Sequence, residues 1–97
     1  MSEVIEKAVE ALNAKMEGGF DGLAKFVISG EGAVIIDENG ARAATGDDPA
    51  DVTLTADTDT FRGMLDGDVN PTSAFMTGKL SVDGDMGLAM KLGAALG

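Results

Sequence analysis

Residues 70–80 read N-P-T-S-A-F-M-T-G-K-L, and residues 84–92 read G-D-M-G-L-A-M-K-L. The first segment opens with Asn70 and Pro71, which is typical of a helix start, because asparagine caps the first turn and proline fits the first helical position. Gly78 ends this short helix. The two segments together predict a helix, a strand and a second helix in close succession.

The last helix is apolar around more of its circumference than one contact with a core requires. We expect a short strand over residues 79–83, after which Gly84 and Asp85 cap a helix that begins at Met86. The apolar arc of this helix spans roughly 220°, against the ~100° stripe of an ordinary surface helix. Either the helix is buried between other elements, or its leucines pack on a sheet while its methionines face a ligand or a partner. The pattern favours the second interpretation.

Methionines gather in the same part of the chain. Four of the six are Met64, Met76, Met86 and Met90. Methionine is flexible and polarisable, and it suits irregular apolar surfaces. These residues could simply fill gaps in a core that contains only four phenylalanines. Together with the wide apolar arc of the last helix, they favour a soft apolar cavity.

Upstream, the apolar pattern changes from helical spacing to alternation. Helical spacing predicts an amphipathic helix over residues 3–17 with Ser2 as its cap. Alternation predicts strands over 23–30, 33–37, 41–44 and 51–57, and in the last of these it points Leu54 inward. Turn residues predict a turn at 30–32, a hairpin at Asn39-Gly40 and a loop at 47–49. A short helix follows from 58 to 66, with Asp57 or Thr58 as its cap.

This order of elements predicts an α+β fold in a single domain over residues 1–97. The strand at 33–37 is apolar on both faces, so we expect it inside the sheet, whereas the weak strand at 41–44 suits an edge. The helical segment between the fourth and fifth strands is long enough for a crossover. We expect a five-stranded, mixed and mainly antiparallel sheet that helices cover on one face.

Composition excludes several functions. Seventeen acidic residues stand against seven lysines and arginines, which gives a net charge of −10. This charge argues against nucleic acid and against docking on an anionic membrane. The chain has no histidine and no cysteine, so structural zinc, thiol chemistry and nucleophiles paired with histidine are excluded. We expect no catalytic residues, no enzyme activity and no cofactor.

Charged residues give no metal site and no evident anion site. Residues 66–70 begin like a calcium-binding loop, but Pro71 and Thr77 stand where that loop requires glycine and glutamate. We therefore expect no metal and interpret the acids as caps and turn residues. The cations that could meet an anionic head group are Arg42, Arg62, Lys79 and Lys91, although each alone fits a solvated surface charge better.

The chain carries no evident targeting segment. Its first seven residues, M-S-E-V-I-E-K, lack the basic start and apolar core of a signal peptide. No stretch approaches the ~20 apolar residues of a membrane-spanning helix. We expect a cytoplasmic protein, with a monomer favoured.

The segments at 70–80 and 84–92 resemble the signature of the sterol carrier protein 2 domain family, N-P-x-S-A-F-x-x-G-K-L followed by G-x-M-G-L-A-M-K-L. The strand at 51–57 and the Asn39-Gly40 hairpin also fall where that family places them, so the resemblance covers nearly the whole chain. It implies a five-stranded α+β domain with a hydrophobic tunnel between sheet and helices. Family members bind sterols, fatty acids, fatty acyl-CoA or phospholipids without catalysing a reaction.

The resemblance also suggests which residues line the tunnel. Those in matching motif positions are Phe75, Met76, Met86, Leu88, Met90 and Leu92, and we expect help from Phe61, Met64 and Leu65. The implied function is binding and intracellular transfer of an apolar lipid, with transient membrane contact. The alternative is an interaction or accessory module whose apolar last helix docks a partner or a second copy.

Overall fold

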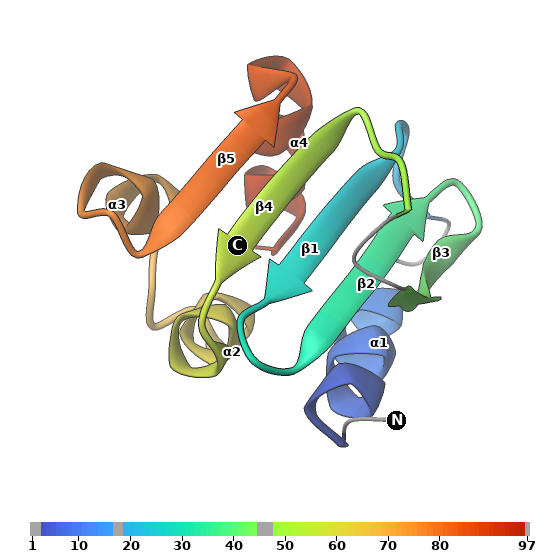
Figure 1. Ribbon diagram of the computed structural model, residues 1–97, viewed down its shortest axis with the longest axis horizontal. Coiled ribbons are helices and arrows are strands. Elements are labelled where there is room, and N and C mark those ends of the chain that lie inside the picture. Colours follow the sequence, from blue (N-terminus) through green and yellow to red (C-terminus); the bar gives the residue numbers. More distant parts are fainter. Residues whose placement is uncertain (1–2, 17–18, 45–47, 97) are drawn as a thin grey trace.

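The structure, a computed structural model, describes residues 3–16, 19–44 and 48–96. Five strands form one sheet in the order β3-β2-β1-β4-β5. Helices α1 and α4 lie behind this sheet, α2 lies at one end of it, and α3 lies beside β5 (Figure 1). The helices are α1 (Glu3–Lys15), α2 (Thr58–Asp66), α3 (Pro71–Met76) and α4 (Met86–Leu96), and the strands are β1 (Ala24–Ile28), β2 (Gly32–Asp37), β3 (Gly40–Ala44), β4 (Val52–Ala56) and β5 (Leu80–Gly84).

The predicted α+β class and the mixed, mainly antiparallel sheet are confirmed. Three of the four strand pairs are antiparallel, and β1 with β4 is the parallel pair. As predicted, β2 lies inside the sheet and β3 at its edge. The prediction of a crossover between the fourth and fifth strands is wrong. Ala56 at the end of β4 pairs with Leu80 at the start of β5, so α2 and α3 begin and end at the same end of the sheet and the two strands run antiparallel.

The capping residues predicted from the sequence define α2 and α3. The Asp57 side chain accepts a hydrogen bond from the Thr60 backbone, and Gly67 ends α2 in the left-handed conformation with a φ of 84°. Asn70 caps α3, and Pro71 occupies its first turn. The predicted cap of the first helix, Ser2, lies outside the described residues, as do residues 17 and 18 at its predicted end and residue 47 of the predicted loop at 47–49.

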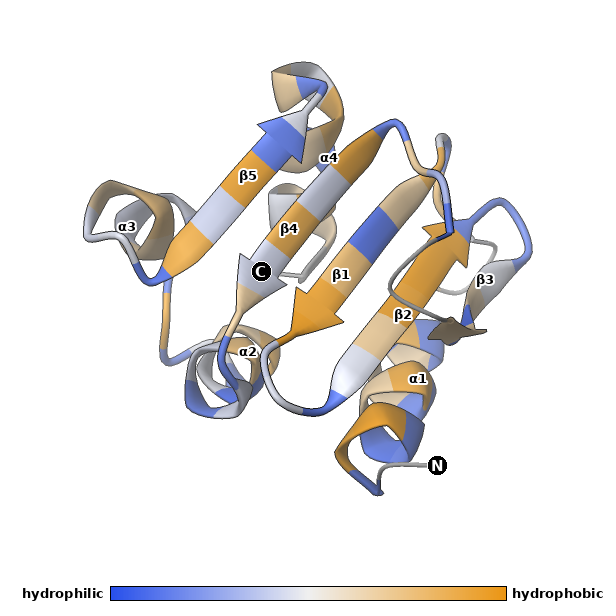
Figure 2. Cartoon of the chain, viewed as in Figure 1, coloured by the Kyte–Doolittle hydropathy of each residue, from blue (hydrophilic) through white to orange (hydrophobic). Residues whose placement is uncertain are grey.

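Apolar side chains fill the space between the sheet and the helices. Hydrophobic residues recur along β1, β2, β4 and β5 (Figure 2). Phe26, at the centre of the inner face, is fully buried and lies edge-on against Phe61 of α2, with ring centroids 4.6 Å apart. Leu12 of α1 and Leu92 of α4 are also fully buried against this face. Burial of an aliphatic or aromatic side chain of this kind stabilises a fold by about 1.5–3 kcal/mol. Ala74 of α3 belongs to the same core cluster, so all four helices contribute to the core.

The outer face of the sheet carries a buried cation. Lys25 of β1 points away from the core because its neighbours Ala24 and Phe26 point inward. Its Nζ donates to the backbone carbonyl of Asp48 at 2.8 Å, and Lys25 is nearly buried. The backbone at Asp48, before β4, thus lies over part of the outer face.

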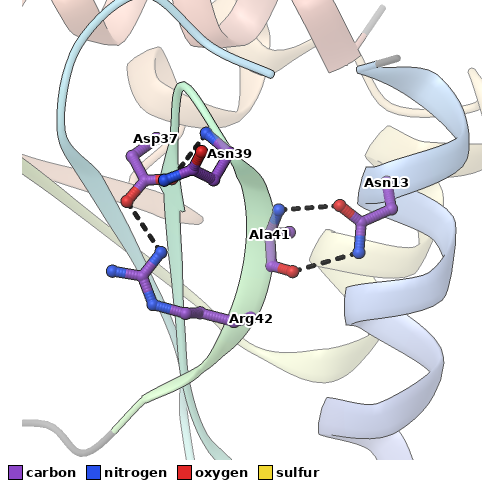
Figure 3. Close-up of polar contacts among 5 residues, drawn as sticks. All are labelled: Asn13, Asp37, Asn39, Ala41 and Arg42. Atoms are coloured by element: carbon purple, nitrogen blue, oxygen red, sulfur yellow. Dashed lines mark hydrogen bonds and ion pairs between the residues drawn. The ribbon is translucent and has the colours of Figure 1, made fainter. Parts of the chain in front are cut away.

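The hairpin between β2 and β3 is held by polar contacts (Figure 3). Arg42 Nη1 lies 2.7 Å from Asp37 Oδ2, and the Asn39 backbone N–H donates to Asp37 Oδ1 at 2.9 Å. The hydrogen bond from Arg42, followed by that from Asn39, holds the pKa of Asp37 below its ordinary value. The hairpin predicted at Asn39-Gly40 is confirmed.

Candidate ligand-binding cavity

An apolar cavity of about 420 Å³ opens between α3, α4 and the β4–β5 side of the sheet. Its volume falls within the ~300–1,000 Å³ of small-molecule sites. The cavity lies where the resemblance implies a tunnel, between sheet and helices. Its lining residues are Leu54, Asn70, Pro71, Thr72, Phe75, Leu80, Val82, Met86, Ala89, Met90, Gly93 and Ala94.

Helix α3 forms one wall and is fixed at both ends. The Asn70 Oδ1 accepts hydrogen bonds from the backbone of Thr72 at 2.8 Å and of Ser73 at 3.2 Å. At the other end, the backbone N–H of Lys79 donates to the carbonyl of Ala74 at 2.8 Å, and the Ala74 side chain is buried. The wall is therefore positioned by a cap and by a turn that leads directly into β5.

Helix α4 forms the opposite wall. The Asp85 side chain accepts a hydrogen bond from the Leu88 backbone at 3.2 Å, and the Asp85 N–H donates to the carbonyl of Asp51 at 3.0 Å. These contacts fix the start of α4 beside the start of β4. Gly93 of α4 faces Pro71 of α3, and a Cβ placed on Gly93 would lie in ordinary contact with Pro71 Cβ, at 3.4 Å.

Exposed large apolar side chains lie on both helices that form the walls of the cavity. Among the described residues, the large hydrophobic side chains that are exposed are Phe75 and Met76 on α3 and Met86 and Met90 on α4. We call these four residues the apolar rim. Met76 and Met90 are exposed to 78% and 75%, yet only Met90 lines the cavity. Clustered exposed hydrophobic side chains mark ligand, membrane or protein contacts more often than scattered ones do.

The structure places the nine predicted site residues in three different environments. Three of them, Phe75, Met86 and Met90, line the cavity. Phe61, Met64 and Leu92 are buried in the core and do not line the cavity. The others are Leu65, which lines a small groove between α1 and α2, Leu88, which packs half-buried against the core near Gly22, and Met76, which is exposed.

Three of the nine residues therefore line this cavity, and the other six do not. Helical spacing correctly identified the inward side of α2, but that side packs on the sheet and α1. Phe61 is held against Phe26 rather than facing the cavity. On α4, Leu92 faces the core while Met90 faces the cavity, as the interpretation with separate leucine and methionine stripes predicted.

Sequence reasoning missed several lining residues. Leu54 and Val82 sit opposite each other on β4 and β5. The clean alternation of residues 51–57 predicts that Leu54 lies on the inner face, but not that it lines a cavity. Ala89 and Gly93 leave room for the cavity by being small. The helix-start pattern at Asn70 predicted a cap but gave no signal that the same residue would also line a cavity.

Among the described residues, those that line the cavity include no charged side chain. Its polar side chains are those of Asn70 and Thr72. The four cations considered for an anionic head group also lie outside it. Arg42 is engaged with Asp37, and Lys91 Nζ lies 3.4 Å from Asp21.

A second hollow, of about 510 Å³, lies between α1 and the edge strand β3. It is more open to solvent, and half of its lining side chains are the charged Glu6, Glu10 and Arg42. An apolar ligand gains little from such a surface, so the cavity beside α4 is the stronger candidate.

None of the helices within the described residues has both the length and the apolar character of a membrane-spanning segment.

The fold and the cavity define a class of protein: a small α+β domain that holds an apolar cavity between the edge of its sheet and two helices. Residues 4–97 match the SCP-2 sterol transfer family. The chain belongs to this family, which confirms the resemblance found in the sequence.

Relatives and solved structures agree with this membership. The chain is 42% identical over 98 residues to hydroxysteroid dehydrogenase-like protein 2 of Xenopus tropicalis, covering 94% of this chain and 24% of that protein. The chain thus spans about a quarter of the length of this curated relative. The solution structure of a sterol carrier protein 2 domain of Helicoverpa armigera is 30% identical, with a TM-score of 0.67, and covers 95% of this chain and 81% of the other.

A second solved structure is similar in fold. Sterol carrier protein 2 of Aedes aegypti, determined in complex with the C16 fatty acid palmitate, has a TM-score of 0.77 and 21% identity. It covers 99% of this chain and 96% of that chain. The likeness confirms the five-stranded architecture with four helices.

Proposed function

We propose that this chain binds an apolar lipid in the cavity between α3, β5 and α4 and transfers it without catalysing a reaction. The observation that carries the proposal is a cavity whose described lining residues are uncharged and whose two helical walls carry exposed apolar side chains. Family membership and the palmitate complex of the Aedes aegypti protein support it.

The driving force for binding is burial of the lipid chain. Each methylene group transferred from water into an apolar site contributes about 0.8 kcal/mol, so ten of them contribute about 8 kcal/mol before the cost of ordering the ligand. The lining supplies contacts of the required kind, because Leu54, Leu80 and Val82 form an apolar floor. No polar anchor is needed for this part of the affinity.

Transfer requires a brief contact with a membrane, and the apolar rim suits that contact. Phe75 and Met86 are exposed to about half of their surface, and Met76 and Met90 to about three quarters. The net charge of −10 opposes approach to an anionic membrane. We therefore propose that the rim contacts membranes of low surface charge and that the charge limits the time spent on anionic ones.

The alternative is that the apolar rim docks another protein or a second copy of this chain. The same exposed side chains favour it, since a surface of this kind also suits protein contacts. Because the chain spans about a quarter of the Xenopus relative, docking within a longer protein belongs to the same alternative.

Native mass spectrometry of the purified chain distinguishes the two. A monomer that carries a co-purified lipid supports the cavity as a binding site. A dimer without lipid supports docking and contradicts the proposed function. Extraction followed by lipid mass spectrometry identifies the bound molecule, and a lipid-transfer assay between vesicles then measures whether it is exchanged.

A further inference from the structure

We propose that Met86 and Met90, the two methionines that line the cavity, are reversible oxidation sites, at which hydrogen peroxide converts the thioether to a sulfoxide and lowers the affinity of the cavity for an apolar lipid. This inference rests on the proposed function. It adds a means of regulating the same site, by a two-electron oxidant that acts on the side chains in contact with the lipid.

Exposure divides the described methionines into two groups. Met76, Met86 and Met90 are exposed, whereas Met16 and Met64 are buried in the core. A peroxide in solution can reach the exposed group in the folded protein, but it reaches a buried sulfur only when the surrounding structure opens. Oxidation of the exposed group therefore needs no unfolding.

Helix α4 places oxidisable side chains at the cavity and leucines towards the core. Met86 and Met90 are four residues apart, so they lie on one face of the helix in successive turns, and both line the cavity. Leu92 of the same helix is fully buried, and Leu88 packs half-buried against the core. Peroxide does not attack leucine. Oxidation thus alters the binding surface of α4 while the contacts that hold the helix on the core remain.

The oxidation is a transfer of one oxygen atom. The thioether sulfur attacks a peroxide oxygen, the O–O bond breaks, an S–O bond forms and water leaves, so that sulfur loses two electrons and the peroxide gains them. The chain contains no cysteine, tryptophan or tyrosine, so no thiol and neither of these aromatic side chains competes for the oxidant. Methionine sulfoxide reductases, supplied with a dithiol, return the sulfoxide to the thioether and release water. The modification is therefore reversible.

A sulfoxide changes the surface that the lipid meets. It converts a flexible apolar side chain into a polar one with an acceptor oxygen. The polar side chains among the described lining residues are those of Asn70 and Thr72, and the Asn70 side chain caps α3. A lipid chain that covers a sulfoxide must remove water from it in surroundings that are mainly apolar, which costs free energy. The oxidised cavity should therefore hold a lipid less tightly, and a bound lipid should shield the two sulfurs from peroxide.

The first test follows the oxidation of each methionine with and without lipid. The protein is treated with hydrogen peroxide at neutral pH, alone or with saturating palmitate, and the oxidised sites are quantified by peptide mass spectrometry. We expect Met76 and Met90 to react first, Met86 next, and Met16 and Met64 last. Palmitate should slow oxidation of Met86 and Met90 severalfold and leave that of Met76 unchanged. Equal rates with and without palmitate, or equal slowing at Met76, would overturn the inference.

The second test compares lipid affinity before and after oxidation. Binding of a pyrene-labelled fatty alcohol, and its displacement by palmitate, are measured on the untreated protein, on the oxidised protein and after treatment with the reductases. We expect oxidation to weaken binding about tenfold and the reductases to restore it. Equal affinity of the oxidised protein would overturn the inference and leave the proposed function intact, and so would a loss that persists once the sulfoxides are reduced. If the untreated protein binds neither lipid, the proposed function fails as well.

A matched set of variants assigns the effect to the cavity. Leucine has nearly the volume of methionine, so the fold should tolerate the exchange. One variant combines Met86→Leu and Met90→Leu, and its control is Met76→Leu. Each protein is its own reference, because the quantity measured is the ratio of affinities before and after peroxide. We expect this ratio to stay near one in the double variant and to fall in the control as in the wild type. The opposite pattern would place the sensitivity at Met76 and contradict the assignment.

Discussion

The side-chain amide of Asn13 pairs with both backbone polar groups of Ala41 (Figure 3). Asn13 Nδ2 donates to the Ala41 carbonyl oxygen at 3.0 Å, and the Ala41 N–H donates to Asn13 Oδ1 at 2.8 Å. Ala41 lies on β3, the edge strand, so a helix side chain takes the place of a neighbouring strand at this point. Edge strands with unpaired backbone groups invite association with other chains, and this contact blocks part of the edge.

Asn13→Ala should destabilise the fold by about 1–2 kcal/mol. It removes two hydrogen bonds of about 0.5–1.5 kcal/mol each, while alanine regains about 0.5 kcal/mol through its higher helix propensity. Urea unfolding measures the difference. Lys15→Ala, at the exposed end of the same helix, is the control and should change stability little. An unchanged urea midpoint in Asn13→Ala would show that water replaces the side chain at no cost.

Gly93 controls the space between α3 and α4. A Cβ at this position would lie 3.4 Å from Pro71 Cβ, which is ordinary contact. Gly93→Ala should therefore raise the free energy of unfolding by up to about 1 kcal/mol through helix propensity. Gly93→Leu should instead fill the cavity and weaken lipid competition strongly. If the leucine variant folds and binds as the wild type does, the ligand does not occupy this cavity.

Asp57 makes the stability of the α2 start depend on pH. The Thr60 backbone N–H donates to Asp57 Oδ1 at 2.7 Å. This bond, followed by one from the Thr60 side chain and by the charge of Lys79, holds the pKa of Asp57 below its ordinary value of 3.8. A lowered pKa in the folded state means that the ionised carboxylate stabilises the fold above pH 3.8, and that this stabilisation is lost as the pH falls through the folded-state pKa.

Asp57→Asn should accordingly be less stable than the wild type at neutral pH, and the difference should shrink at pH 3. Urea unfolding at both pH values checks this. Asp59→Asn changes a carboxylate in the same turn and is the control. A stability difference that grows on acidification would mean that the sign of the pKa shift is wrong.

The acidic surface predicts how salt affects transfer. With a net charge of −10, approach to anionic vesicles should be slow at low salt and should speed up as salt screens the repulsion. Transfer to zwitterionic vesicles should depend much less on salt. A fluorescent lipid and vesicles of the two compositions provide the measurement, and equal salt responses would contradict this role of the charge.

The secondary structure was predictable because each element carries its own signal. Asn70-Pro71 and Asp57 predicted helix starts by side-chain chemistry, and alternation placed Leu54 on the inner face. The pairing of β1 with β4 was not predictable, because alternation shows which way a side chain points and not which strand lies beside it. Which strands pair is decided by contacts between distant parts of the chain.

The sequence predicted only part of the cavity, because helical spacing identifies apolar positions but not what each of them faces. Helical spacing identified Met90 and Leu92 as apolar positions, but it could not show that Leu92 meets the core while Met90 meets the cavity. That difference depends on where α3 stands relative to α4. Gly93 of α4 lies opposite Pro71 of α3. The sequence does not show which residue of another helix faces a glycine within a helix.

The central claim, that the cavity is the lipid site, is tested most directly by a matched pair of substitutions. Met90 and Met76 are exposed to nearly the same extent, at 75% and 78%, but only Met90 lines the cavity. Each is replaced by glutamate, and equilibrium binding of a pyrene-labelled fatty alcohol is measured on variants shown to be folded. We predict that Met90→Glu weakens binding by about tenfold or more, whereas Met76→Glu leaves it near the wild-type value. Equal effects of the two substitutions, or full binding by a folded Met90→Glu variant, would contradict the assignment of the site.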